Sequence, residues 1–251
     1  MWQDVKETFG RNITKTLYEN GMIRTWYKDQ PSGWRLVSKI WSPFYINLRP
    51  IGSFENSQQI LNDVGSVMGQ MIKEESPEVN KIVGIASAGV PLATAITMKS
   101  GIPMCYTRKL EDVKDIGQLE ANISKYGQHS LVEGELNDGD VLGLVDDLVT
   151  RFDSKLIAKR QVEYEAEKKG ISIECKDVDV LLDREQGASK RANDLGMQLH
   201  SVIQFKTDGL PWLKDMMTET EYNVITDYLN DSVKYQDEKL QKELMQMALK
   251  V

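Results

Sequence analysis

The sequence predicts an α/β fold in which a mainly parallel sheet is flanked by helices and preceded by a small N-terminal flap. Two observations predict this fold. Short apolar runs alternate with segments of helical spacing through the middle of the chain, and the run at residues 141–145 has the composition of a strand buried on both faces of a parallel sheet. With 251 residues, 41% of them hydrophobic, the chain can bury the core that such a sheet requires.

The first 56 residues are expected to form the flap. Helical spacing at the start of the chain gives way to an aromatic turn, which the turn residues Pro31 and Gly33 close. Residues 34–39 and 44–48 then alternate apolar and polar side chains, as half-buried strands do. We therefore assign residues 1–56 to an N-terminal helix and flap.

A core at residues 57–218 is expected to follow the flap. Apolar side chains recur at helical spacing along residues 57–73, which predicts a helix. Strands that alternate with helices imply a parallel sheet with right-handed crossovers. The runs that predict strands lie at residues 82–86, 103–106, 141–145 and 178–182. Residues 219–251 are assigned to a charge-rich helical segment, either solvated or part of a subunit interface.

Composition excludes several classes of protein. The 38 acidic and 31 basic side chains give a net charge of −7, whereas proteins that bind nucleic-acid backbones present a basic surface. No apolar run approaches the roughly 20 residues needed to span a bilayer, and the start of the chain lacks the apolar region of a signal peptide. Cys105 and Cys175 are too few for a disulfide framework. We therefore expect a cytoplasmic protein that acts on small molecules, with no nucleic-acid or membrane partner.

Two adjacent carboxylates, Asp146 and Asp147, end the apolar run at residues 141–145. Ligands of open α/β sheets bind in the crevice at the carboxyl ends of the strands, where the following helix offers unpaired N–H groups to an anion. Neighbouring carboxylates repel each other unless hydroxyls, a cation or backbone donors compensate. A ribose diol with a bound divalent ion supplies this compensation, so the pair predicts a sugar-phosphate site. An acidic pair that is hydrogen-bonded within the fold is the alternative.

Two other strand ends carry groups suited to anions. Residues 84–92 run from a strand through small side chains into a helix, and small side chains let backbone N–H groups approach an anion. A tight packing turn has the same composition. Arg184 follows the run at residues 178–182, where a guanidinium can grip a planar carboxylate through two hydrogen bonds. A surface ion pair with Asp183 or Glu185 is the alternative.

In their order and spacing, these segments resemble the orotate phosphoribosyltransferase family, including the corresponding domain of uridine monophosphate synthases. The similarity spans about residues 34–230. It rests on residues 36–49, 84–92, 108–109, 131–134, 146–147, 181–187 and 199–202. The resemblance implies a type I phosphoribosyltransferase-like fold. It also implies a step of pyrimidine biosynthesis, in which ribose 5-phosphate passes from phosphoribosyl pyrophosphate to N1 of orotate, giving orotidine monophosphate and pyrophosphate.

The resemblance further implies a Mg²⁺ ion carried by phosphoribosyl pyrophosphate without direct protein ligands, and a homodimer whose lid residues complete the neighbouring site. It implies that four residues are catalytic: Lys109, Lys125, Asp146 and Asp147, the two aspartates holding the ribose hydroxyls. The implied substrate contacts are Phe44, Tyr45 and Arg184 for orotate, Ala86, Ser87, Ala88, Gly89, Arg108 and Lys109 for pyrophosphate, and Thr150, Arg151 and Ser154 for the 5′-phosphate.

The chain departs from the family pattern in the phosphate loop, where Phe152 and Asp153 stand in place of glycine and a small residue. A phenyl ring obstructs the backbone approach that glycine allows, and Asp153 brings a negative charge towards a phosphate of about −1.5 to −2. Asp153 is instead expected to cap a helix at residues 154–169, which Gly170 would end. The alternative function is therefore a non-catalytic or altered-specificity module that binds a nucleotide or has a regulatory role.

The long polar stretch at residues 109–135 is typical either of a lid or of a disordered insertion. The family's lid lysine matches two registers, Lys125 and Lys114, and both remain open. Near the flap, Lys39 follows Val37-Ser38, so a lysine that the family places before Ser-Gly is absent or displaced here. Of the two histidines, His129 is expected to be solvated and His200 structural.

Overall fold

A six-stranded sheet forms the centre of the computed structural model, which describes residues 1–36, 39–111, 113, 115–123 and 129–250. The strand order is β10-β9-β8-β5-β6-β7, and all neighbours are parallel except the antiparallel pair β6 and β7. The strands are β5 (Lys81–Gly84), β6 (Met104–Thr107), β7 (Val132–Glu133), β8 (Asp140–Val149), β9 (Ile173–Asp183) and β10 (Gln198–Gln204). The predicted mainly parallel sheet is therefore confirmed.

The order of the strands creates a crevice at their carboxyl ends. After β5 the chain continues to β6 on one side of β5, and β8 later pairs with β5 on its other side. The loops that follow β5 and β8 therefore run away from each other. This reversal is where open α/β sheets bind ligands. Gly89 lets the helix after β5 begin against β8, because a Cβ atom at this residue would lie 2.2 Å from the Val145 carbonyl oxygen.

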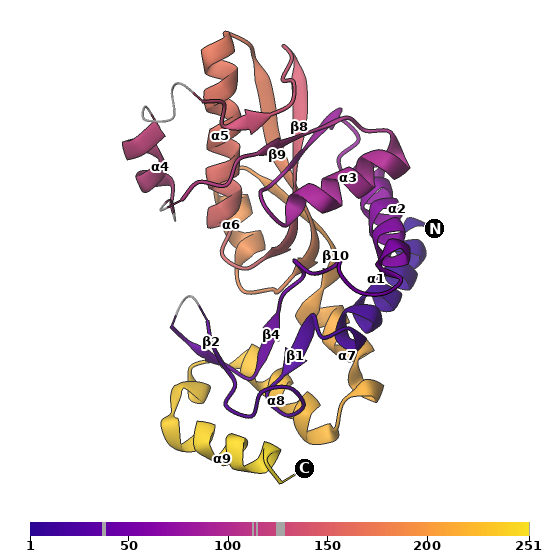
Figure 1. Cartoon of the computed structure of the whole chain (residues 1–251), viewed down its shortest axis with the longest axis vertical. Helices are drawn as coiled ribbons and strands as arrows, with labels where there is room; N and C mark the ends of the chain where they lie inside the picture. The colour runs from indigo at the N-terminus through magenta and orange to yellow at the C-terminus, as the bar shows by residue number, and fades with distance from the viewer. Residues whose placement is uncertain (37–38, 112, 114, 124–128, 251) are drawn as a thin grey trace.

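Helices cover both faces of the sheet (Figure 1). On one face lie α1 (Trp2–Glu19), α2 (Ser57–Glu75) and α3 (Gly89–Ser100), and on the other lie α5 (Asp153–Lys169) and α6 (Ala188–Asp194). Helix α5 buries Ala158 and Val162 against the sheet because these residues recur on one helical face. The helix predicted at residues 57–73 is confirmed as α2, and Gly170 ends α5 in a left-handed conformation, as predicted.

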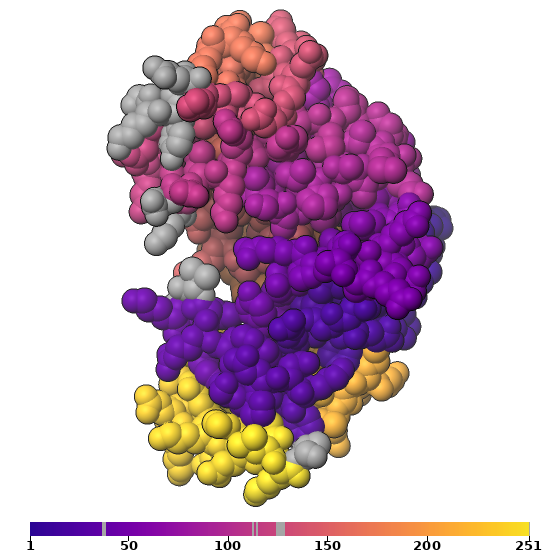
Figure 2. All heavy atoms as spheres, viewed as in Figure 1, coloured from indigo at the N-terminus to yellow at the C-terminus, as the bar shows by residue number. Residues whose placement is uncertain are grey.

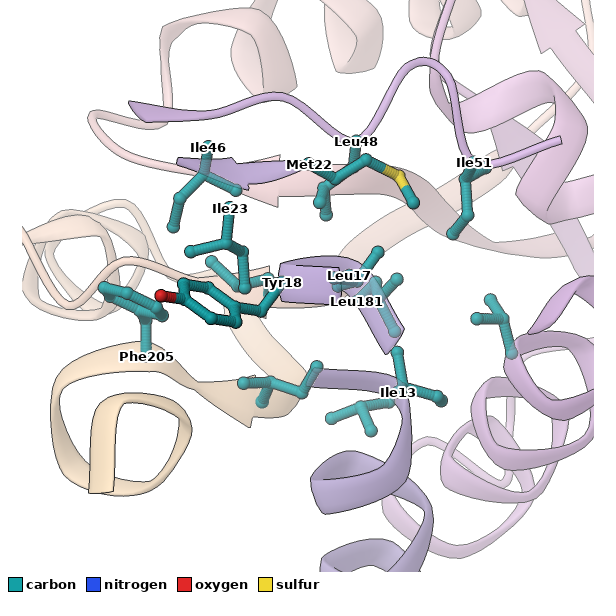
Figure 3. Packing of buried hydrophobic residues seen from close by; sticks show 14 of the residues in the cluster. Ile13, Leu17, Tyr18, Met22, Ile23, Ile46, Leu48, Ile51, Leu181 and Phe205 are labelled. Atoms are coloured by element: carbon teal, nitrogen blue, oxygen red, sulfur yellow. The ribbon is translucent and has the colours of Figure 1, made fainter. Parts of the chain in front are cut away.

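Two short antiparallel pairs form the flap. Strand β1 (Ile23–Thr25) pairs with β4 (Phe44–Ile46), and β2 (Trp34–Arg35) pairs with β3 (Trp41–Ser42). Residues 23–25 were not predicted to form a strand, and β2 is shorter than the predicted strand at 34–39, of which residues 37 and 38 lie outside the described part. Figure 3 shows that the flap and the sheet share one hydrophobic core, to which Ile23, Ile46 and Leu181 contribute.

The C-terminal segment packs on the flap rather than standing free (Figure 1). This segment, assigned to residues 219–251, contains α8 (Glu219–Asn230), η4 (Lys234–Gln236) and α9 (Glu238–Ala248), and η2 (Phe205–Gly209), α7 (Leu210–Trp212) and η3 (Lys214–Met216) connect it to β10. Trp26 Nε1 donates a hydrogen bond to the Leu244 carbonyl oxygen (3.1 Å), and the rings of Trp41 and Tyr235 stack with centroids 6.3 Å apart. The flap is therefore built from both ends of the chain.

The described part of the polar stretch at 109–135 is partly helical. Helix α4 (Ile116–Asn122) buries Leu119 with Ile123 and Leu131, and Tyr164 of α5 packs against this small cluster. The stretch is thus not a wholly disordered insertion. None of the described helices is long and apolar enough to cross a membrane.

A buried charge cluster ties α1 and α2 to the sheet. Glu75, the last residue of α2, accepts hydrogen bonds from Trp2 Nε1 and Lys6 Nζ, both at 2.8 Å. Its carboxylate lies 3.4 Å from His200 Nδ1 on β10, whose Nε2 lies 2.9 Å from Asp177 of β9. Burial opposes the charge on His200, but hydrogen bonds to the two carboxylates raise its pKa to about 10. His200 is therefore a structural cation, as expected.

We predict that His200→Gln lowers the free energy of unfolding by about 3 kcal/mol at pH 7, because it leaves the buried carboxylate of Asp177 without its cation. The pKa of His200 is raised above 6.5, so the stabilisation is complete below that pH and is lost as the pH rises through about 10. Urea unfolding should show that the variant and the wild type differ less in free energy of unfolding at pH 10 than at pH 7. The same change at the exposed His129 should have no such effect, and a difference that does not depend on pH would contradict the assignment.

Candidate active site

A cavity of about 970 Å³ lies at the carboxyl ends of β5, β8 and β9, between the sheet and the flap. Figure 2 shows the molecule hollowed between these two parts. Most of the predicted site residues meet there although they come from four separate segments. Those that line the cavity are Tyr45, Ala86, Ser87, Ala88, Asp146, Asp147, Thr150, Arg151, Ser154 and Arg184.

Four other predicted residues do not line the cavity. Phe44 is fully buried beneath it, and Gly89 packs against β8 with its N–H bonded to the Ile85 carbonyl oxygen (2.9 Å). Arg108 forms a half-exposed ion pair with Glu133 (3.3 Å), and Lys109 is exposed. The two candidate lid lysines, Lys114 and Lys125, lie outside the described residues.

The loop after β5 offers a small-residue surface to the cavity. Ala86 and Ser87 are joined by a cis peptide bond, and the Ala86 N–H donates to Thr107 Oγ1 on the neighbouring strand β6 (3.1 Å). Ala88 is the N-cap residue of α3, so the first turn of that helix opens towards the same crevice. N–H groups in a first turn have no partner within the helix, which suits this end of the cavity to an anion.

A buried lysine neutralises half of the acidic pair at the end of β8. Lys155 is 2% exposed, and its Nζ lies 2.8 Å from Asp146 Oδ2. Lys155 was not among the predicted site residues, although Lys155 shares the inward face of α5 with Ala158 and Val162. A lysine at an inward helical position requires a buried partner, and this signal could have identified the ion pair.

Asp147 has no ion-pair partner within 4.0 Å in the described part of the chain. Burial raises its pKa to about 7, and the neighbouring charge of Asp146 contributes in the same direction. Lys155 opposes this rise. The carboxyl of Asp147, which lines the cavity, is therefore harder to ionise than that of an exposed aspartate.

Phe152 and Asp153, the two residues that depart from the family pattern in the phosphate loop, do not fill the cavity. Phe152, not Asp153, is the N-cap residue of α5, so the predicted cap was wrong. The backbone of Phe152 is left-handed (φ 75°), which turns its ring into the core of the α5 face, where it is 1% exposed. Asp153 is the first residue of α5, and its Oδ1 lies 2.6 Å from Arg191 Nη2 on α6. Arg191 also donates to the Arg151 carbonyl oxygen, so the loop is tied to α6.

Arg184 is a buried cation whose hydrogen-bond donors are not all used. It is 5% exposed, and its Nε and Nη2 are buried with no hydrogen-bond partner among the described residues. Its guanidinium lies over the ring of Phe44 at 4.9 Å. Burial lowers its pKa from the ordinary arginine value. Because an unpaired buried guanidinium is costly, this arrangement is suited to an anionic ligand in the cavity.

The C-terminal segment supplies a wall of the cavity that sequence reasoning missed. Tyr228 packs edge-on against Phe44 at 5.8 Å, and Asn230 and Ser232 follow it along the wall. No motif marks these residues, because they reach the cavity only through the packing of the last helices on the flap. The site therefore depends on tertiary contacts between distant segments.

No family model matches the chain. The orotate phosphoribosyltransferase of Saccharolobus solfataricus is 32% identical over 194 residues, which cover 76% of this chain and 86% of that protein. That of Staphylothermus marinus is 30% identical over 226 residues, which cover 89% of this chain and 96% of that protein. This chain belongs to the orotate phosphoribosyltransferase family. The uridine 5′-monophosphate synthase of Bos taurus is 31% identical over 172 residues, but the matched part is only 32% of that longer protein.

Solved structures agree on the fold of this family member. The uridine monophosphate synthase of Leishmania donovani superposes with a TM-score of 0.66 and 21% identity, over 88% of this chain and 42% of that chain. The orotate phosphoribosyltransferase of Aeropyrum pernix gives 0.60 and 22% identity, over 81% of this chain and 97% of that chain. The predicted type I phosphoribosyltransferase-like fold is confirmed.

We predict that Phe152→Gly lowers the free energy of unfolding by about 3 kcal/mol. Glycine relieves the left-handed backbone by about 1 kcal/mol, but the loss of a fully buried ring costs about 3–5 kcal/mol. Denaturant unfolding measures the difference. Lys39→Gly is the matched control, because Lys39 is also left-handed (φ 63°) but is exposed, so glycine there should not destabilise the protein. A Phe152→Gly variant as stable as wild type would place the ring outside the core.

Proposed function

We propose that the protein transfers ribose 5-phosphate from phosphoribosyl pyrophosphate to N1 of orotate and releases pyrophosphate. The observation that carries this proposal is the guanidinium of Arg184, a buried cation in the wall of the cavity that forms no ion pair among the described residues. Orotate is a planar carboxylate, and a guanidinium binds such a group through two parallel hydrogen bonds. Family membership supports the same activity.

In this reaction the bond from C1 of the ribose to pyrophosphate breaks and a bond from C1 to N1 of orotate forms. The transition state has the character of an oxocarbenium ion, so the protein contributes mainly by holding the reactants and by neutralising the departing pyrophosphate. The acidic pair near the end of β8 supplies the carboxylate that accepts hydrogen bonds from the ribose hydroxyls. The loop at residues 86–88 faces the pyrophosphate, and Tyr45 and Arg184 face the base.

The 5′-phosphate is proposed to bind at the first turn of α5. That turn has N–H groups without helical partners, and the side chains of Thr150, Arg151 and Ser154 line the cavity beside it. The ion pair between Asp153 and Arg191 cancels the negative charge that Asp153 brings to this loop. Since the ring of Phe152 lies in the core, the backbone of the loop remains accessible.

Mg²⁺ is proposed to arrive on phosphoribosyl pyrophosphate, where it would neutralise pyrophosphate charge. Lys155 already pairs with Asp146, so the charges present at the acidic pair are compatible with a substrate-borne ion. We also propose a cytoplasmic homodimer. Arg108 and Lys109 do not line the cavity of their own chain, which supports a role for them in the partner's site.

The proposal is tested by incubating the protein with orotate, phosphoribosyl pyrophosphate and Mg²⁺ and measuring orotidine monophosphate. We predict product formation, and a KM for orotate at least tenfold higher in Arg184→Lys, because lysine keeps the charge but loses the paired hydrogen bonds. The KM for phosphoribosyl pyrophosphate should change less. Arg24→Lys is the matched control, because Arg24 is exposed and lies outside the cavity. No product at high enzyme concentration would favour a non-catalytic or regulatory module.

A second prediction concerns the charge in the phosphate loop. Arg191→Met frees the Asp153 carboxylate, so the inhibition constant of inorganic phosphate should rise about three- to tenfold. Adding Asp153→Asn to Arg191→Met should restore phosphate binding, because the uncompensated charge is then removed. Competition of inorganic phosphate against phosphoribosyl pyrophosphate measures both variants. Equal weakening in the single and the double variant would show that Arg191 acts on phosphate directly.

A further inference from the structure

The two carboxylates at the end of β8 differ in what surrounds them. Asp146 Oδ1 accepts a hydrogen bond from the Asp147 N–H (2.9 Å), and its Oδ2 accepts one from Lys155 Nζ (2.8 Å). Each oxygen of Asp146 thus accepts one hydrogen bond within the protein, and one of these bonds comes from a cation. Asp147 Oδ1 accepts from the Leu148 N–H (2.7 Å), and its carboxyl forms no ion pair in the described part of the chain. Only Asp147 is therefore held without a cation.

Lys155 is as firmly committed as Asp146. Besides Asp146, its ammonium donates to the Leu148 carbonyl oxygen (2.7 Å) and lies 3.3 Å from Ser154 Oγ. An ammonium has three donors, and these contacts use all of them. They join the end of β8 to the first turn of α5 across the phosphate loop. Asp146 is therefore held by a buried cation, whereas no cation pairs with Asp147 in the described part of the chain.

We propose that Lys155 divides the acidic pair: it fixes Asp146 as a positioning carboxylate between β8 and α5, and it leaves Asp147 as the carboxylate that binds the ribose diol. The inference deepens the proposed function and rests on it for the ligand class, a ribose 5-phosphate. Lys155 and Asp146 act through Asp147 and through the loop that they hold, whereas Asp147 touches the sugar.

The charged groups that face Asp147 are Asp146 on its own strand and Lys155 on α5. The loop after β5 contributes no charged side chain, and Asp183 at the end of β9 is bonded to the Glu185 N–H and Ser189 Oγ. An ionised carboxylate is the better acceptor for two hydroxyls, so binding of the diol should strengthen as Asp147 loses its proton. Removing Lys155 should raise the midpoint of this transition, and removing the charge of Asp146 should lower it.

The test compares Asp147→Asn with the paired variant Asp146→Asn/Lys155→Gln, in which two neutral amides can still hydrogen-bond each other. Calorimetry with ribose 5-phosphate gives Kd, and thermal unfolding gives Tm. We expect Asp147→Asn to raise Kd at least tenfold without lowering Tm. The paired variant should lose at least fivefold less affinity, and its Tm should lie above that of Asp146→Asn or Lys155→Gln alone, since either single change leaves a buried charge unpaired.

The pH dependence separates this role from a purely structural one. Across pH 5.5–8.5, the midpoint for ribose 5-phosphate binding should move upward in Lys155→Gln and downward in Asp146→Asn, while the ionisation of the ligand phosphate is common to all variants. If Asp147 does not bind the diol, neither midpoint should move, and that result would contradict the inference. A folded paired variant that loses as much affinity as Asp147→Asn would overturn the inference, and so would a paired variant less stable than both single variants.

Wild-type binding distinguishes this inference from the proposed function. A wild-type protein that binds ribose 5-phosphate but forms no orotidine monophosphate would overturn only the proposed reaction. A wild-type protein that binds no ribose 5-phosphate would overturn both.

Discussion

Burial and mutual repulsion oppose the ionisation of two neighbouring carboxylates in a strand buried on both faces, and here Lys155 compensates one of them, Asp146. The ion pair between Lys155 and Asp146 lies where β8 ends and α5 begins, so it also sets how the chain crosses from the sheet to the helix. The loop between them carries the groups proposed to bind the 5′-phosphate. The charge at the sugar site and the shape of the phosphate site therefore depend on one interaction.

The unusual residues of the phosphate loop, Phe152 and Asp153, are compatible with that crossing because the ring of one is buried and the charge of the other is paired. Phe152 turns into the α5 core through a left-handed backbone, and Asp153 is paired with Arg191. Backbone groups and the hydroxyl residues Thr150 and Ser154 line the cavity beside them. On the opposite wall, the flap brings Tyr45 over the cavity, and the C-terminal helices fix the flap in place through Trp26 and Trp41. Both ends of the chain are thus needed to close one site.

The sequence predicted the parallel sheet, α2, the acidic pair and the position of Arg184, because apolar runs and strand-end polar residues are local signals. It did not predict the left-handed conformation of Phe152, since φ above zero is uncommon for any residue other than glycine. Lys155 carried a readable signal, an inward position on α5 beside Ala158, but its partner could be found only in three dimensions. The wall formed around Tyr228 had no local signal, because it arises from packing between distant segments.

The central claim is that the phosphate loop binds a sugar phosphate although it contains Phe152 and Asp153. A crystal structure of the protein with ribose 5-phosphate tests this claim most directly. We predict that the phosphate lies at the first turn of α5, with the ring of Phe152 still in the core and Asp153 still on Arg191. A phosphate bound elsewhere, or an Asp153 carboxylate occupying that turn, would contradict the account.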